Sequence, residues 1–214
     1  MRAARNSAGK SRGKRPFVLC LTGSLGMGKT TAARFFAEAG IPVHDSDAVV
    51  HALYEGEAVE AIERAFPGST SGGKVDRNTL GAAVLHDGAA LARLEAIVHP
   101  LVSASTDRFL AQATAQGAAV VVLDVPLLFE AQLECRCDAV VVVTAPLEIQ
   151  RRRAFERPGM TEDKFAALLA KQMPDAEKRR RAHFVLDSSG TFAHARRQVR
   201  DILRAVGKMP RRPR

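Results

Sequence analysis

The stretch PFVLCLT (16–22), followed at once by GSLGMGKT (23–30), decides the fold of this chain. The eight residues from 23 to 30 match G-x-x-x-x-G-K-[ST], in which glycines let the backbone wrap so that successive N–H groups point at phosphate oxygens. An apolar strand pattern precedes the motif and a helical pattern over 30–39 follows it, so that the helix dipole adds positive potential at the loop. A glycine-rich turn formed by chance is the alternative. The order of strand, motif and helix favours a P-loop that binds a nucleotide.

Two side chains of this loop carry chemistry. Lys29 is expected to reach the β- and γ-phosphates of ATP, and the Thr30 hydroxyl is expected to bind Mg²⁺. The loop predicts a nucleotide but no particular reaction, so the acceptor has to be inferred from other parts of the chain.

The rest of the chain alternates between strand and helix patterns. Further apolar strand patterns occur at 41–45, 118–124, 139–144 and 183–187. Helical patterns occur at 46–117, 126–134, 146–182 and 191–206. Short apolar strands separated by helical crossovers predict an α/β fold, a parallel five-stranded sheet flanked by helices. We expect one P-loop kinase domain over 16–206, whose helical insertion 46–117 lies above the carboxyl ends of the strands, where open sheets bind ligands.

The net charge of +9 is carried by the two ends of the chain. Residues 1–15 hold six of the 32 basic residues and residues 207–214 hold four, and neither segment contains an acid. The remaining 22 basic residues face 23 acidic ones, so the body between these tails has a net charge of −1. The basicity therefore does not predict a specific nucleic-acid partner. The N-terminal segment is expected to be a disordered tail, with a targeting sequence or weak polyanion binding as alternatives.

The cysteines and the apolar stretches point to a compartment. No stretch approaches the roughly 20 consecutive apolar residues that span a membrane, and the N-terminal segment lacks the apolar core of a secretory signal. Cys20 falls in the first strand pattern and is expected to be an inert core residue. Cys135 and Cys137 form a C-x-C pair with no second pair nearby, which is not the spacing of a zinc site. A reducing cytoplasm fits this cysteine usage best.

Aspartates follow two of the predicted strands. The strand at 41–45 ends in Asp45-Ser46-Asp47, and Asp124 closes the strand at 118–124. A carboxylate at the end of a strand beside the P-loop can accept the proton of an acceptor hydroxyl and help to orient Mg²⁺. Capping of the next helix by Asp45 or Ser46 is the alternative. Asp124 is placed like the aspartate that holds Mg²⁺ in P-loop enzymes, although an ordinary strand-end turn would look the same.

A basic helical segment follows at 150–182. Residues 150–181 hold ten Lys or Arg against five acids, and Pro158-Gly159 interrupts the helical pattern. Such a segment is suited to act as a lid that closes over a triphosphate and spreads the charge of the transition state. Most of these side chains are expected to be solvated helix surface, and the charge count does not say which of them touch phosphate.

Taken together, these motifs resemble those of one family, dephospho-CoA kinase, over about residues 17–205. The stretches that carry the resemblance are, in order, LTGSLGMGKTT (21–31), GIPVHDSDAVVH (40–51), DRNTL (76–80), LEAIVHPLV (94–102), LDVPLLFE (123–130), QRRRAFERPGMT (150–161), the region of Gln172 and Lys178, and FVLDSSG (184–190). The resemblance implies ATP-dependent phosphorylation of the ribose 3′-hydroxyl of dephospho-CoA, the last step of coenzyme A synthesis.

The resemblance also implies the site residues, position by position. Asp47 matches the catalytic base and Arg153 the lid arginine that contacts phosphates, which leaves Asp45 a structural role. Lys29 completes the catalytic set. The ATP loop corresponds to Gly26, Met27, Gly28, Lys29, Thr30 and Thr31. The acceptor-binding positions fall on Arg77, His99, Leu127, Leu128 and Glu130. Mg²⁺ would be held by Thr30 and Asp124.

The chain departs from the family pattern near its last strand. DSSG (187–190) stands where the family often has an Asn-containing turn, and His183 stands where an acid is common. These departures leave the adenine contacts open. By itself, His99 within a helical pattern is more often a packing residue than a catalytic one.

Two rival functions remain open at this stage. One is another small P-loop kinase, for a nucleoside monophosphate, a nucleoside or shikimate, and the long helical stretch after Asp47 argues against it. The other is a P-loop regulator that hydrolyses slowly and binds nucleic acid through the basic tails. We expect ATP and dephospho-CoA as small-molecule partners, no membrane or specific nucleic acid, and a monomer or weak homo-oligomer.

Overall fold

The computed structural model of the chain describes residues 14–85 and 87–213. The expectation of a disordered tail falls mainly on residues 1–13, which lie outside the described residues. The elements in chain order are β1 (Phe17–Thr22), α1 (Lys29–Glu38), β2 (Val43–Asp45), α2 (Ser46–Leu53), α3 (Val59–Ala65), β3 (Thr70–Ser71), β4 (Lys74–Val75), α4 (Arg77–Val84), α5 (Gly88–Ala115), β5 (Val120–Asp124), the 3₁₀ helix η1 (Leu133–Arg136), β6 (Ala139–Thr144), α6 (Leu147–Phe155), α7 (Glu162–Ala170), α8 (Asp175–Arg181), β7 (Phe184–Asp187) and α9 (Phe192–Val206).

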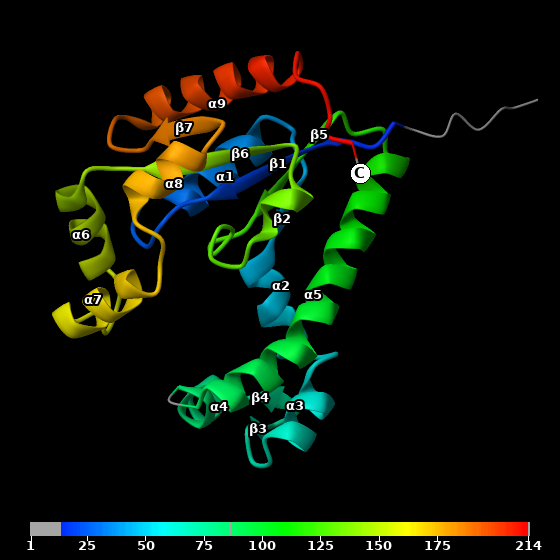
Figure 1. The fold of residues 1–214 in the computed structure, drawn as a ribbon, viewed down its shortest axis with the longest axis vertical. Coiled ribbons are helices and arrows are strands. Elements are labelled where there is room, and N and C mark those ends of the chain that lie inside the picture. Colours follow the sequence, from blue (N-terminus) through cyan, green and yellow to red (C-terminus); the bar gives the residue numbers. More distant parts are fainter. Residues whose placement is uncertain (1–13, 86, 214) are drawn as a thin grey trace, which may run out of the picture.

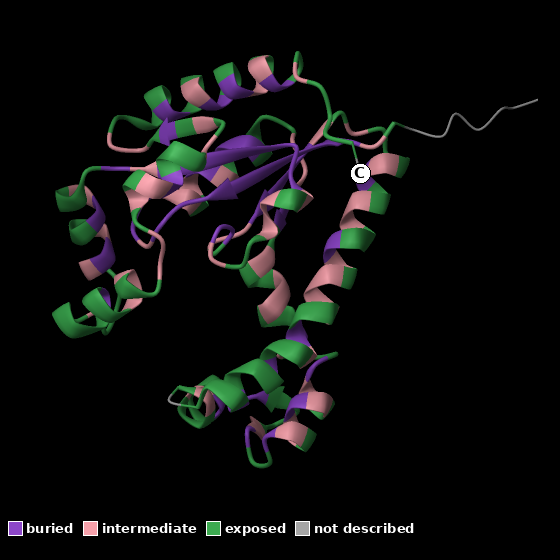
Figure 2. Cartoon of the chain, in the orientation of Figure 1, coloured by how far each residue is buried: buried purple, intermediate pink, exposed green. Residues whose placement is uncertain are grey.

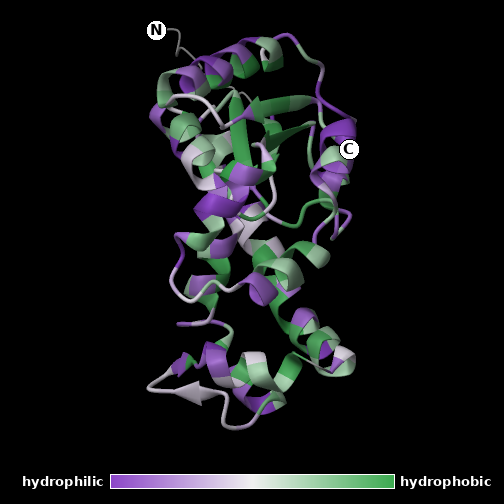
Figure 3. Cartoon of the chain, turned by 90° about the vertical axis from the view of Figure 1, so that its left-hand side faces the viewer, coloured by the Kyte–Doolittle hydropathy of each residue, from purple (hydrophilic) through white to green (hydrophobic). Residues whose placement is uncertain are grey.

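A five-stranded parallel sheet in the order β2-β5-β1-β6-β7 forms the centre of the molecule, which confirms the predicted fold class. Figure 2 shows its strands as the most deeply buried part of the chain, and Figure 3 shows them as its hydrophobic layer. Because parallel strands all end at the same edge, the P-loop after β1, Asp45 at the end of β2 and Asp124 at the end of β5 meet there. This edge carries the site.

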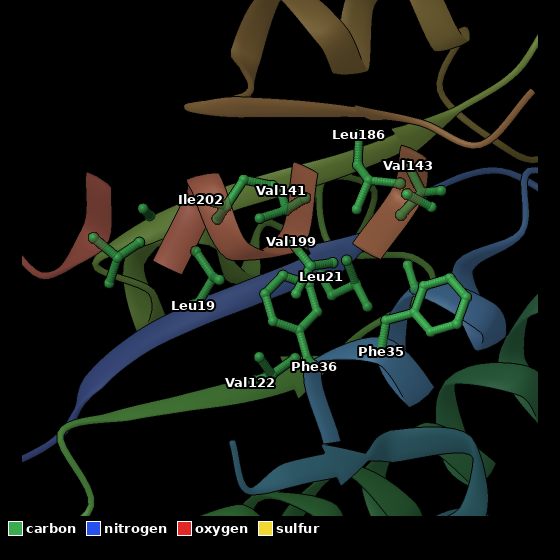
Figure 4. Close-up of a cluster of buried hydrophobic side chains, with 14 of the residues drawn as sticks. Leu19, Leu21, Phe35, Phe36, Val122, Val141, Val143, Leu186, Val199 and Ile202 are labelled. Atoms are coloured by element: carbon green, nitrogen blue, oxygen red, sulfur yellow. The ribbon is translucent and has the colours of Figure 1, made fainter. Parts of the chain in front are cut away.

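Helices α1 and α9 cover one face of the sheet. Figure 4 shows Phe36 of α1 and Val199 and Ile202 of α9 packed among Leu21 of β1 and Val141 of β6. Full burial of such a side chain contributes about 1.5–3 kcal/mol. The buried residues of α9 recur at helical spacing, so only one face of this helix is apolar: Ala195, Val199, Ile202 and Val206. The P-loop helix α1 is thereby fixed on a rigid support.

The opposite face is covered by the C-terminal part of α5 and by the segment that leads from β5 to β6. Ala113 of α5 and the neighbouring Leu128 and Phe129 pack there against β1, β5 and β6. The first part of α5 runs away from the sheet with α2 (Figure 1). It joins α3, α4 and the small β3–β4 hairpin around an apolar core of their own. The expected insertion is therefore a separate packing unit tied to the sheet by α2 and α5.

Two secondary-structure expectations were wrong. The segment 126–134 was expected to be helical, but it forms turns followed by η1, and Gln132 has a positive φ of 55° that a helix does not accommodate. The adjacent side chains of Leu128 and Phe129 are both buried in the core, which holds the segment in this non-helical course. The insertion 46–117 was expected to be helical, with almost no strand. It contains the β3–β4 hairpin, whose turn uses Gly72 and Gly73 at positive φ.

The cysteine expectation also needs correction. Cys20 of β1 and Cys137, just before β6, form a disulfide across 117 positions of sequence. Cys20 is therefore a buried cross-link and not a free core thiol. The spacing of cysteines along the chain did not reveal this pair, because only the pairing of β1 with β6 brings the two together. Cys135 is free and exposed.

The two tails are not wholly separate from the folded body. The buried carboxylate of Asp138 accepts two hydrogen bonds from the Arg15 guanidinium, both at 2.7 Å, and bonds from the N–H groups of Val18 and Arg212, both at 2.8 Å. Arg15 also donates to the Arg212 carbonyl at 2.6 Å. Both ends of the described chain are thus fixed at one carboxylate. No helix within 14–85 or 87–213 is long and apolar enough to cross a bilayer.

Candidate active site

The P-loop is held in shape by contacts from the basic helical segment. Gly26 and Gly28 adopt positive φ angles of 77° and 85°, and a Cβ at Gly26 would lie 2.5 Å from the carbonyl oxygen of Gln150. Only glycine fits there. The Leu25 N–H donates to Gln172 Oε1 at 3.1 Å, and its carbonyl accepts from Gln150 Nε2 at 2.8 Å. The loop is therefore preorganised, as a phosphate-binding backbone requires.

Lys29 and Asp124 form an ion pair at the foot of the loop. Lys29 begins α1 and Asp124 ends β5, and Nζ lies 2.6 Å from Oδ1 of a carboxylate that is 2% exposed. Burial raises the pKa of Asp124, Lys29 acts against this rise, and the carboxylates of Asp45 and Asp47 add to it. Three acids thus crowd one end of the sheet. The edge beside the P-loop favours an additional positive charge.

Asp45 and Asp47 have different surroundings. Asp45 is the N-cap of α2, and its Oδ1 accepts the N–H of Asp47 at 2.9 Å and that of Ala48 at 3.1 Å. The capping interpretation of the sequence is therefore confirmed for Asp45. Asp47 lies in the first turn of α2 and is exposed, and within the described part of the chain its carboxylate has no hydrogen bond or ion pair. It is available to accept a proton.

A cavity of roughly 820 Å³, here called the Asp47 cavity, lies between the sheet, α2, α5 and the turn that follows β5. Five of the predicted residues line it: Asp47, His99, Leu127, Leu128 and Glu130. Leu127 is 45% exposed although it is apolar, which is a surface suited to an organic ligand. Other parts of the wall are apolar and come from α2 and α5: Val50, Tyr54, Leu94, Val98 and Val102. The cavity thus combines these apolar walls with the carboxylates of Asp47, Glu95 and Glu130.

Arg77 is not among the residues that line this cavity. Its guanidinium lies 2.5 Å from His51 Nδ1 and 5.6 Å from the ring centroid of Tyr54, which does line the cavity. Arg77 therefore contacts Tyr54 of the cavity wall without lining the cavity itself.

Glu130 lines the cavity, but its carboxylate is already engaged. Oε1 accepts the N–H of Met173 at 2.8 Å and lies 2.8 Å from Nζ of Lys178, whose side chain is fully buried. Burial would raise the pKa of Glu130, but the ion pair with Lys178 and the hydrogen bond from the Met173 N–H outweigh it, and the net shift is downward. Glu130 is therefore held as a carboxylate by the protein itself.

Arg153 lies against the P-loop. Its guanidinium, in α6, donates to the hydroxyl and to the carbonyl of Ser188, both at 2.8 Å, and the Ser188 hydroxyl donates to the Met27 carbonyl at 2.7 Å. A Cβ at Gly28 would lie 3.3 Å from Nη1 of Arg153. Arg153 is thus one contact away from the phosphate-binding backbone.

The neighbouring arginines point elsewhere. Arg151 pairs with Glu162 and lies 5.1 Å from the ring centroid of Phe155. Arg152 is exposed, and the described part of the chain offers it no hydrogen bond or ion pair. The expectation that most of the basic side chains are helix surface agrees with these two.

Three residues that contact the P-loop belong to segments that carry the family resemblance, but no site role was predicted for them from the sequence: Gln150, Gln172 and Ser188. Only position could have indicated Ser188, because it follows the last strand and so reaches the same edge as the P-loop. The two glutamines carry no local signal. Their roles depend on how α6 and the α7–α8 linker fold back onto the loop.

A second cavity, of roughly 890 Å³, lies on the other side of the P-loop and is here called the Met27 cavity. Ser24 and Met27 of the loop, the end of β6, and helices α6, α7 and α8 form its walls. Met27 also accepts the Ala145 N–H at its sulfur, at 3.1 Å. The P-loop therefore borders the Met27 cavity directly, whereas the Asp47 cavity is lined by the strand ends, α2, α5 and the turn after β5.

The oxygen atoms beside the P-loop fit a Mg²⁺ ion that is bound jointly by the protein and by the phosphates of a nucleotide. Mg²⁺ prefers oxygen ligands and is commonly bound by one or two carboxylates together with substrate phosphates. Within 14–85 and 87–213 no group of three or more His, Cys, Asp or Glu is arranged to hold a metal ion. Thr30 in the first turn of α1 and Asp124 supply oxygen atoms beside the loop. Burial and the neighbouring acids raise the pKa of Asp124, and a bound cation would reduce this repulsion between the carboxylates.

The comparisons with known proteins agree with this geometry. A family model for dephospho-CoA kinase matches residues 17–194. A dephospho-CoA kinase of Rhodopseudomonas palustris (strain BisB18) is 59% identical over 195 residues, which cover 91% of this chain and 98% of the relative. One of Agrobacterium fabrum is 56% identical over 190 residues, covering 89% and 98%.

Solved structures show the same fold. A crystal structure of a Thermus thermophilus protein matches with a TM-score of 0.81 and 36% identity, over 90% of this chain and 98% of that one. The dephospho-CoA kinase of Campylobacter jejuni matches with a TM-score of 0.61 at 22% identity, over 90% and 98%, which speaks for the fold alone. The family model covers most of the described residues, and the two relatives named above are identical to this chain at more than half of the aligned positions. The chain therefore belongs to the dephospho-CoA kinase family.

Proposed function

We propose that this chain transfers the γ-phosphoryl group of ATP to the ribose 3′-hydroxyl of dephospho-CoA, which yields coenzyme A and ADP. The observation that carries the proposal is the unengaged Asp47 carboxylate, which lies on the wall of a largely apolar cavity beside the P-loop. Membership of the family supplies the identity of the acceptor.

The P-loop binds the triphosphate in this proposal. Backbone N–H groups of residues 26–31 donate to phosphate oxygens, and Lys29 places its ammonium at the β- and γ-phosphates. Its ion pair with Asp124 fixes the ammonium before the nucleotide arrives. Arg153 lies against the loop through Ser188 and is positioned to neutralise charge that develops on the transferred group.

Asp47 acts on the acceptor. The acceptor occupies the Asp47 cavity with its ribose hydroxyl toward the carboxylate, and Asp47 takes up the hydroxyl proton as the oxygen attacks the γ-phosphorus. Tyr54, Val98, His99 and Leu127 contribute the walls that contact the organic part of the acceptor. Since Asp45 is occupied as a helix cap, only Asp47 of this pair is free for proton transfer.

Mg²⁺ belongs to the proposal as the counter-ion of the triphosphate. Thr30 and Asp124 would hold it, and it would neutralise charge on the phosphates when bound. The remaining steps are carried by the side chains described above.

Small-molecule substrates, ATP and dephospho-CoA, are the partners of this family. We extend the proposal to a monomer or weak homo-oligomer in the cytoplasm, without membrane or specific nucleic-acid partners. The net charge of −1 between residues 16 and 206 supports the last point.

Release of ADP with a panel of acceptors tests the proposed function. Dephospho-CoA, AMP, UMP and shikimate are each supplied with ATP and Mg²⁺. We expect dephospho-CoA alone to stimulate ADP release well above the rate without acceptor. A higher rate with AMP or shikimate would contradict the assignment of the acceptor while leaving the P-loop kinase fold in place.

A further inference from the structure

A buried charge pair lies outside the catalytic set. The Lys178 side chain, in α8, is 0% exposed, and its Nζ lies 2.8 Å from Oε1 of Glu130. Leaving one partner of a buried pair without the other costs several kcal/mol. The two residues are therefore locked together, so that α8 and the turn after β5 move as one body.

The linker between α7 and α8 joins this body to the P-loop. Its residues Gln172 and Met173 are consecutive but face in different directions. Gln172 Oε1 accepts the N–H of Leu25 in the P-loop at 3.1 Å, and the N–H of Met173 donates to Glu130 at 2.8 Å. One peptide unit thus separates a contact to the nucleotide loop from a contact to the wall of the Asp47 cavity. A displacement of the linker would disturb both.

The two cavities also meet at this linker. Glu130 lines the Asp47 cavity, whereas Gln172 and Met173 line the Met27 cavity on the other side of the P-loop. Within the described residues, the Glu130 carboxylate forms hydrogen bonds and ion pairs only with Met173 and Lys178 and has none with the P-loop. Through Met173, the linker connects the Glu130 carboxylate to the P-loop contact of Gln172.

We propose that Glu130, Lys178 and Gln172 are positioning residues that hold the α7–α8 linker as a bridge between the two substrate sites, so that the state of one site affects affinity at the other. The inference rests on the proposed function, since it assigns the Asp47 cavity to the acceptor. Glu130 acts on the acceptor site through Lys178 and the Met173 backbone.

Crossed effects of two substitutions test the bridge. Glu130→Gln, on the acceptor side, is expected to weaken binding of β,γ-imido-ATP in the absence of acceptor by about fivefold or more, the lower end of usual coupling between sites. Gln172→Ala, on the P-loop side, is expected to raise the KM of dephospho-CoA at saturating ATP by a similar factor. Lys171→Ala is the matched control, because it is exposed and adjacent to Gln172, and it should change neither quantity.

A purely local role predicts the opposite pattern. If Glu130→Gln alters only the KM of dephospho-CoA and Gln172→Ala only the binding of the ATP analogue, the bridge is refuted. If the Glu130→Gln variant unfolds because Lys178 is left unpaired, a double variant replaces it. That variant combines Glu130→Gln with Lys178→Met, so that no unpaired charge is buried, and it is measured in the same way. Binding of the ATP analogue is measured without turnover, so it tests the bridge even if the wild-type protein is inactive. An inactive wild type would contradict the proposed function alone.

Discussion

At the start of α2, the Asp45 carboxylate accepts two backbone N–H groups while the Asp47 carboxylate is free beside a cavity. We expect Asp47→Asn to leave the chain folded and able to bind ATP, since the amide keeps the shape of the side chain. Loss of a positioned acid or base typically lowers kcat by roughly 10²–10⁴. Steady-state turnover with dephospho-CoA, measured beside the thermal midpoint, checks this.

Asp45→Asn is the control for that experiment. Asn is nearly as good an N-cap as Asp, so the substitution should cost only a few tenths of a kcal/mol and leave turnover close to wild type. Near-normal turnover in Asp47→Asn together with a large loss in Asp45→Asn would reverse the two roles.

Lys29 is the second residue whose removal has a defined consequence. Lys29→Ala removes the ammonium at the phosphates and leaves the buried Asp124 without its partner. We expect kcat to fall by about 10²–10³, as is usual when one preorganised charge contact is removed. Activity above half of wild type in a coupled ADP assay would be incompatible with the role of Lys29 at the phosphates.

At the scale of elements, α6 carries three consecutive arginines in different environments. Only Arg153 reaches the P-loop through Ser188, whereas Arg151 pairs with Glu162 on the surface. We therefore expect Arg153→Ala to lower kcat/KM by at least tenfold more than Arg152→Ala or Arg151→Ala, by loss of a charge-assisted contact near the transferred group. Kinetics of the three variants under identical salt measure the difference. Equal, mild losses would indicate that α6 acts only as a diffuse positive field.

The elements also show where sequence patterns succeed. Strands such as β1 and β6 are continuous apolar runs between turn signals because both of their faces are buried, and the strand patterns predicted all five strands of the parallel sheet. The segment 126–134 mixes apolar and polar residues at helical spacing, but tertiary burial of Leu128 and Phe129 overrides this pattern. Local propensity could not report this.

The same contrast holds for the candidate site. The P-loop, Asp47 and Asp124 were predictable, because each follows a strand whose end is visible in the sequence. The contacts of Gln150 and Gln172 with Leu25 span 125 and 147 positions, and the Cys20–Cys137 disulfide spans 117. Such partners are set by the folding of distant segments onto one another, which no local pattern encodes.

For the whole molecule, Asp138 is the point where both ends of the described chain are fastened. Burial would raise its pKa, but the bonds from Arg15, Val18 and Arg212 outweigh it and hold the pKa of Asp138 below its ordinary value. A carboxyl whose pKa is depressed on folding contributes stability above its unfolded pKa, and this stability is lost as pH falls through the folded pKa. We expect Asp138→Asn to destabilise the protein at pH 7 by roughly 3 kcal/mol, as for a broken buried pair.

Urea unfolding at pH 7 and at about pH 3, below the ordinary pKa of an aspartate, measures this contribution. The difference between wild type and Asp138→Asn should shrink at the lower pH. Asp201→Asn is the matched control, because Asp201 pairs with Arg204 on the surface, where such pairs contribute about 0–1 kcal/mol. A variant at Asp138 that is as stable as this control at pH 7 would show that the fastening is dispensable.

In the proposed function, the whole molecule brings the γ-phosphate of ATP to a hydroxyl of an acceptor held in the Asp47 cavity. Phosphorus NMR of the reaction of the wild-type protein with ATP, Mg²⁺ and dephospho-CoA tests it most directly, because it reports both the nucleotide and the acceptor. We expect one phosphomonoester to appear on the ribose 3′ position for each ADP formed. Release of ADP and free phosphate with an unchanged acceptor, or a phosphate at another position, would contradict it.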